Sequence, residues 1–161
     1  TVGFTGTAEL PVLSGPHRSV RPLSWQQVCE MGKHGISFGS HTLTHASLPQ
    51  LGEEELRREV YSSRLLLEEK LGRGVPFFCY PKGELTSTVK TVVQRAGYDG
   101  ACSTYPGPVR AASDLFALPR TYIGRDDTLS DFRKKLCGAY DLLQTGVQLW
   151  RRVRSRRPSS R

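Results

Sequence analysis

The chain has 161 residues, of which 37% are apolar, and a formal net charge of +8. That length suffices for one domain with a hydrophobic core, and the composition is that of a globular rather than a disordered protein. No apolar run approaches the roughly 20 residues of a membrane-spanning helix, so we expect no transmembrane segment. No signal peptide is apparent, and the compartment, cytoplasm or cell envelope, stays open.

The excess positive charge lies at the C-terminus. Six arginines fall within residues 151–161, and no acidic residue accompanies them. We therefore divide the chain into a domain over residues 1–140 and a helical end with a basic tail over 141–161. Because the charge of the remaining chain is modest, we expect no nucleic-acid partner; a nucleic-acid-binding module would depend on the tail alone.

Hydrophobic periodicity and capping residues predict alternating helices and strands. In chain order we expect a helix over 24–33, a strand over 36–39, a helix over 52–71, a strand over 75–80, a helix over 86–96, strands over 100–104 and 116–123, and a helix over 128–140. Short strands that alternate with helices predict an α/β fold with a parallel sheet, either a barrel or an open sheet.

Residues 40–45, with the sequence SHTLTH, carry two histidines four positions apart. If this segment turns helically, His41 and His45 lie on one face and can share a metal ion. A zincin-type metalloprotease needs glutamate directly after the first histidine, where this chain has Thr42, so that class is disfavoured. On spacing alone, a shared metal and two unrelated surface histidines both stay open.

Several further motifs follow in a fixed order: an acid-rich helix that ends in Leu-Gly, a strand with YPKG, then AGYDG, and finally LPR. Together with SHTLTH, this order resembles the polysaccharide deacetylase family (carbohydrate esterase family 4) over roughly residues 20–135. The resemblance implies a deformed (β/α) barrel of about seven strands. It also implies removal of N- or O-linked acetyl groups from an acetylated polysaccharide by a divalent metal, Zn²⁺ with Co²⁺ or Ni²⁺ as alternatives.

The same resemblance implies roles for individual residues. They are metal ligation by His41 and His45, oxyanion stabilisation by the backbone N–H of Lys82 after Pro81, and a substrate groove at Tyr80 and Arg120.

Two family motifs are absent from the chain. No Asp-Asp pair precedes His41, where the family carries T-F-D-D-G on its first strand, and no histidine follows His45, where the family carries L-x-x-H. We therefore expect a barrel that is incomplete at its N-terminus, with an exposed sheet edge that lowers stability or promotes association. The alternative function is that of a non-enzymatic carbohydrate-binding relic of the same fold.

Overall fold

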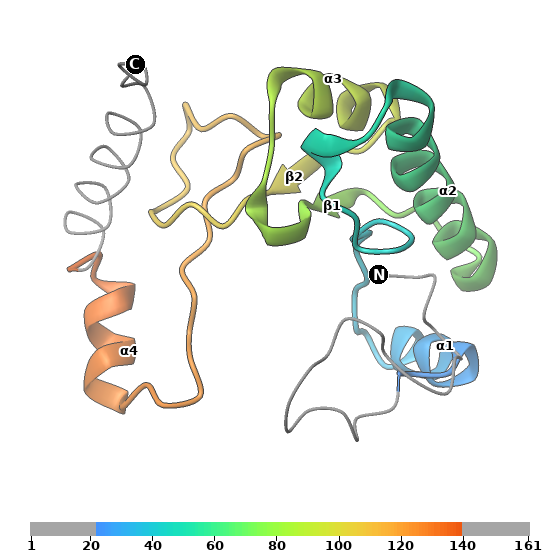
Figure 1. Ribbon diagram of the computed structural model, residues 1–161. Helices are drawn as coiled ribbons and strands as arrows, with labels where there is room; N and C mark the ends of the chain where they lie inside the picture. The colour runs from blue at the N-terminus through green and yellow to red at the C-terminus, as the bar shows by residue number, and fades with distance from the viewer. Residues whose placement is uncertain (1–21, 140–161) are drawn as a thin grey trace, which may run out of the picture.

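The computed structural model describes residues 22–139 (Figure 1). The elements are α1 (Trp25–Lys33), η2 (Leu48–Gln50), α2 (Glu53–Leu71), β1 (Phe77–Cys79), η3 (Pro81–Gly83), α3 (Ser87–Arg95), β2 (Gly100–Cys102) and α4 (Leu129–Leu136). The four predicted helices are confirmed, although α4 ends four residues early, at Leu136. The predicted boundary at residue 140 and the tail over 141–161 lie outside the described residues.

Three of the helices begin at side-chain caps that the sequence displays. Ser24 accepts a hydrogen bond from the Gln27 backbone while the Gln27 side chain accepts one from the Ser24 backbone, which forms a capping box at α1. At α3, the Thr86 side chain accepts a hydrogen bond from Val89 N–H, without a reciprocal side-chain bond. At α4, Thr128 forms a second capping box. Local sequence therefore accounts for where these helices start.

The sheet is smaller than predicted. Strands β1 and β2 pair in parallel, with Phe78 opposite Ala101 and Cys79 opposite Cys102. Beyond β1, Ser40 forms a single bridge to Phe78, and beyond β2, Leu118 forms a single bridge to Cys102. Within residues 22–139 these four segments form an open patch of sheet, so the predicted barrel of about seven strands is not observed.

The predicted strands over 36–39 and 116–123 are therefore wrong, and local chemistry explains both. Ile36 is 46% exposed, so its side chain is not buried as that of a core strand would be. The backbone of Phe77 approaches Gly39 so closely that a Cβ there would lie only 3.1 Å from the Phe77 carbonyl oxygen. In the later segment, Pro119 directly follows the bridging Leu118 and has no N–H to continue a ladder. The first segment is followed by a single bridge at Ser40, one residue past its end, and the second contributes a single bridge at Leu118.

Helices α2 and α3 cover one face of this sheet (Figure 1). The buried side chains of α2 are spaced by four, three and four residues, the stripe of a helix with one inward face: Leu56, Val60, Ser63 and Leu67. They pack with Val89, Val92 and Val93 of α3 and with Phe78, Tyr80 and Tyr98. The polar Ser63 is satisfied there, because it donates to the Val60 carbonyl and shares a 2.6 Å hydrogen bond with Ser40.

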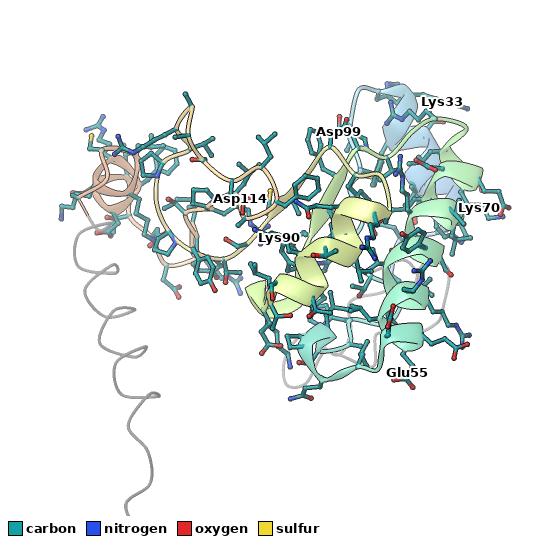
Figure 2. All side chains as sticks on the ribbon, turned by 90° about the horizontal axis from the view of Figure 1, so that it is seen from above. Lys33, Glu55, Lys70, Lys90, Asp99 and Asp114 are labelled. Atoms are coloured by element: carbon teal, nitrogen blue, oxygen red, sulfur yellow. The ribbon has the colours of Figure 1, made fainter. Side chains whose placement is uncertain are left out.

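The chain after β2 returns once to the core, where Phe116 packs against it and Leu118 bridges Cys102, and then leaves it. Figure 1 shows an extended segment that leads to α4, which lies apart from α2 and α3. No residue from 104 to 139 is buried, and apolar side chains of α4 stay exposed, with Leu129 at 65% and Leu136 at 69%. An ion pair between Lys90 of α3 and Asp114 (2.7 Å, Figure 2) ties the first part of this segment to the core.

No helix in the described part combines the length and apolarity that crossing a bilayer requires.

Candidate functional site

The two histidines of SHTLTH come together at the end of the Ser40 bridge. The centroids of the His41 and His45 rings lie 4.9 Å apart, edge to face. The segment is not the helical turn that the spacing suggested. Thr42 and His45 instead adopt positive φ angles of 67° and 66°, and these two left-handed residues fold the loop back on itself.

His41 is oriented by the neighbouring strand. Its Nδ1 lies 2.7 Å from the carbonyl oxygen of Cys79, which makes Nδ1 the protonated nitrogen and Nε2 the acceptor. Burial lowers the pKa of His41 below its usual 6.5, and the hydrogen bond to Cys79 opposes that shift. The ring is therefore neutral at neutral pH, which is the form that ligates metals.

The YPKG motif forms a tight turn directly after β1. Lys82 and Gly83 both have positive φ, 55° and 72°, and the turn is closed by Gly83 N–H donating to Tyr80 O (3.0 Å). A Cβ at Gly83 would lie 1.9 Å from Thr104 Oγ1, so only glycine fits. The turn lies beside residues 40–45, the histidine loop. Cys79 contacts His41, and Ser47, just past the loop, donates to Glu84 (2.6 Å).

The structure thus places four of the six predicted site residues, His41, His45, Pro81 and Lys82, on two adjoining loops. The Lys82 side chain is exposed, whereas Pro81 is buried. The hydrogen bonds that close the turn use the N–H groups of Gly83 and Glu84. They therefore do not involve Lys82 N–H, the group predicted to donate to an oxyanion.

Tyr80 and Arg120, the two predicted groove residues, differ in their surroundings. Tyr80 is fully buried, its ring packs against Phe78 at 5.3 Å, and its hydroxyl donates to Phe116 O (2.9 Å). Burial raises the pKa of Tyr80 far above its ordinary range, and the contacts favour a packing role over a groove role. Arg120 is exposed, donates from Nε to Ser103 O (2.8 Å) and borders a cavity of about 230 Å³.

The charge of Arg120 also influences Cys79 and His41. Burial raises the pKa of the Cys79 thiol, and the charge of Arg120 beside that thiol opposes the rise. Burial is the main cause of the lowered pKa of His41, and the Arg120 charge makes the smallest contribution to it.

Sequence analysis missed a residue that contacts the histidine loop. Glu59 of α2 accepts hydrogen bonds from the loop between the two histidines. Nothing in the sequence distinguished it from the other glutamates of α2, since the contact depends on how the helix packs. Among the described residues, the donor set for a metal at this loop stays at two imidazoles. Residues 22–139 contain no cluster of three or more His, Cys, Asp or Glu side chains able to hold an ion.

Comparison with known proteins now identifies the family. The model of the family "Polysaccharide deacetylase" matches residues 9–101, more than half of the chain. This chain belongs to the polysaccharide deacetylase family. The resemblance drawn from the ordered motifs is thereby confirmed at the level of the family, which is a family of hydrolases and typically metal-dependent.

Solved deacetylase structures share the fold of this family member. The deacetylase PplD of Streptococcus pyogenes superposes with a TM-score of 0.68 and 26% identity, covering 73% of this chain and 52% of PplD. The polysaccharide deacetylase BC0361 of Bacillus cereus gives 0.66 and 29%, covering 73% of this chain and 37% of BC0361. The Bacillus subtilis protein YxkH is 28% identical over 101 residues, 63% of this chain and 36% of YxkH. The chain thus spans about half or less of each relative's length.

Proposed function

We propose that this chain forms part of a metal-dependent hydrolase that removes N- or O-linked acetyl groups from a polysaccharide. The observation that carries the proposal is the pair of imidazoles held 4.9 Å apart, with His41 Nδ1 hydrogen-bonded to Cys79 O. Metal-bound histidines characteristically donate their second ring nitrogen to a carbonyl or carboxylate, which fixes the tautomer and the ring orientation. Membership of the deacetylase family supplies the reaction class.

The metal would be held by His41 and His45. Imidazole suits Zn²⁺, Co²⁺ and Ni²⁺, so the residues present fit such an ion in kind, and they are two of the three protein ligands that catalytic zinc normally takes. When bound, the metal would polarise the acetyl carbonyl and acidify the attacking water. The neutral state of His41, favoured by its burial, suits this role.

The chain's own residues would handle the charge that develops on the acetyl oxygen. Lys82 N–H would donate to this oxygen, and the turn that presents it is fixed by Gly83 against Thr104. Arg120, held by its hydrogen bond to Ser103 O, would add positive charge near the site. The solved structure of PplD is a complex with acetate, the product that deacetylation releases, which supports the same chemistry here.

Zinc binding by calorimetry tests the first half of this proposal. We expect the wild-type chain to bind one zinc ion, and His41→Ala and His45→Ala to weaken binding by roughly 100-fold or more. His34→Ala is the matched control, because His34 is exposed on the end of α1 and pairs with Glu30 (3.1 Å). Equal binding by all four proteins would refute the metal site.

Acetate release tests the second half. The wild-type chain is incubated with N-acetylglucosamine oligomers and, separately, with acetylated xylan oligomers, which distinguishes amide from ester hydrolysis. Acetate that appears from either substrate and disappears in His41→Ala supports the proposal. Zinc binding without acetate release from either substrate counts against hydrolysis by this chain.

The carbohydrate-binding relic is the second candidate function. It is favoured by the donor set of two imidazoles within the part of the chain that the structure describes. This candidate predicts that the chain binds the same oligomers without zinc, and that His41→Ala leaves that binding unchanged.

A further inference from the structure

The loop between the two histidines holds a backbone that the sequence does not favour. Thr42 and His45 occupy the left-handed region, where residues other than glycine are uncommon and a β-branched residue such as Thr42 is rare. One internal bond helps, since Thr42 Oγ1 accepts from His45 N–H (3.0 Å). A loop of this kind persists only when surrounding structure holds it in place.

Glu59 provides that anchor with both oxygens of its carboxylate. Oε2 accepts from the backbone N–H groups of Leu43 (2.9 Å) and Thr44 (3.0 Å), and Oε1 accepts from the Thr44 hydroxyl (2.7 Å). Hydrogen bonds to an ionised acceptor are stronger than neutral ones, and two successive N–H groups form a natural cradle for an anion. The carboxylate is thus hydrogen-bonded to the two residues at the middle of the loop.

The anchor is rigid because of where it stands on α2. Glu59 is half-buried and directly precedes Val60, which is fully buried in the core. Ser63, one turn later on α2, bonds to Ser40 immediately before His41. One helix therefore holds the histidine loop at its start and at its middle.

We propose that Glu59 is a positioning residue that sets His45 against His41 for metal binding, an inference that rests on the proposed function. Glu59 acts through the backbone of Leu43 and Thr44, whose N–H groups donate to its carboxylate. The exposed first turn of the same helix carries three other glutamates that make no such hydrogen bonds to the loop, Glu53, Glu54 and Glu55. The role is therefore specific to position 59.

The test compares Glu59→Gln with Glu54→Gln, which removes the same charge from the same helix at an exposed position. We expect Glu59→Gln to weaken zinc binding roughly 10- to 100-fold, as loss of an outer partner of a metal ligand does, and Glu54→Gln to leave it unchanged. Thr44→Val removes only the bond to Oε1 and should weaken binding by a smaller factor.

Amide hydrogen exchange in the metal-free proteins supplies a readout that does not depend on zinc. Exchange at Leu43 and Thr44 should speed up in Glu59→Gln and not in Glu54→Gln, while the exchange of α3 stays slow. If Glu59→Gln does not fold, the Thr44→Val comparison decides alone.

The outcomes separate the two proposals. Zinc binding by the wild type that is equally tight in Glu59→Gln and Glu54→Gln overturns the positioning role and leaves the proposed function standing. Absence of zinc binding in the wild type overturns both. A wild type that binds zinc, with a selective loss in Glu59→Gln and faster exchange at Leu43 and Thr44, supports both.

Discussion

The core that ends at Ser103 and the segment over 104–139 differ in how much of their apolar surface is buried. The core buries a continuous set of aliphatic and aromatic side chains between α2, α3 and the sheet. No side chain of the later segment is fully buried, although Phe116 packs against the core and the segment contains exposed apolar residues such as Leu115 and Phe132. Its helix is held by a capping box, by ion pairs and by a hydrogen bond from Lys135 to Tyr122 O.

The difference shows what a cap can do without packing. Thr128 starts α4 as effectively as Ser24 starts α1, yet α4 has no buried residue. Most helical stability in proteins comes from packing an apolar face, so α4 and its surroundings should open more easily than the core. The two loops of the proposed site belong to the stable part, because they lie at the edge of the core sheet, whereas Arg120 belongs to the later segment.

Deleting a core ring should produce the largest effect. Phe78 is 1% exposed and packs against Tyr80 and Tyr98, so Phe78→Ala should lower the free energy of unfolding by about 3–5 kcal/mol. Phe132→Ala in α4, where the ring is 39% exposed, should cost about 0.5 kcal/mol. Urea denaturation measures both, and similar costs would erase the contrast between the two regions.

The junction between the regions should be the next most sensitive place. Gly83→Ala places a methyl group against Thr104, and should cost about 1–3 kcal/mol more than Gly35→Ala. Gly35 has a similar φ of 85° and open space around it, so the control isolates the clash from the backbone strain. Thermal melting compares the two variants, and equal melting temperatures would show that the turn moves freely against Thr104.

Acid should weaken the core through Glu68. This carboxylate accepts from Val75 N–H (3.0 Å) and from Arg64 Nε (2.8 Å), and the Val75 bond is the main reason that the pKa of Glu68 lies below its usual 4.5. A lowered folded pKa contributes stability that is present above the unfolded pKa and is lost as pH falls through the folded pKa. Stability should therefore decline as the pH drops below about 4.5.

Glu68→Gln tests this origin of acid sensitivity. The variant should lose about 1 kcal/mol at neutral pH and show a flatter decline in acid, because glutamine keeps one acceptor and no charge. The exposed neighbour Glu69→Gln should keep the wild-type pH profile. Identical profiles for all three proteins would assign the acid sensitivity to other carboxylates.

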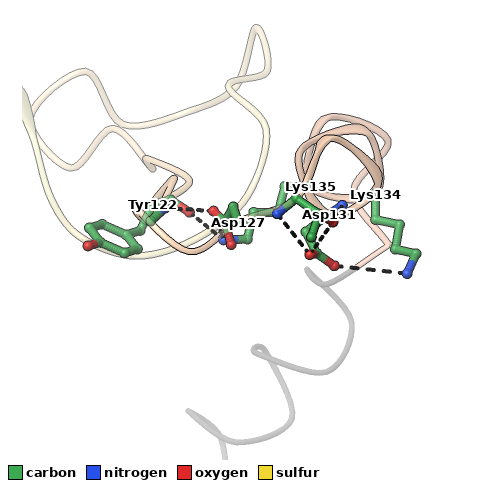
Figure 3. Close-up of polar contacts among 7 residues, drawn as sticks. Tyr122, Asp127, Asp131, Lys134 and Lys135 are labelled. Carbon is green, nitrogen blue, oxygen red and sulfur yellow. Dashed lines mark hydrogen bonds and ion pairs between the residues drawn. The ribbon is translucent and has the colours of Figure 1, made fainter.

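The smallest effect is expected in the later segment. Lys135 donates to Asp127 (2.5 Å) and to Tyr122 O (3.0 Å), contacts that hold α4 to the preceding turn (Figure 3). The hydrogen bond from Lys135 is the main reason that the pKa of Asp127 is lowered. Lys135→Met should speed amide exchange within α4 roughly several-fold and leave the melting temperature unchanged. A drop in the melting temperature would mean that α4 folds together with the core.

The sequence by itself determined the helices, their caps and the family. Ser24, Thr86 and Thr128 act on groups within three residues, and the motifs from SHTLTH to LPR occur in linear order, so neither requires knowledge of long-range contacts. Tertiary structure decided the rest. Strand pairing depends on which distant segment supplies a partner, and in place of the predicted strands over 36–39 and 116–123 the structure has single bridges at Ser40 and Leu118. Two further contacts join residues far apart in sequence: the buried Tyr80 donates to Phe116 O, and Glu59 accepts from the histidine loop. No local sequence pattern predicts such contacts.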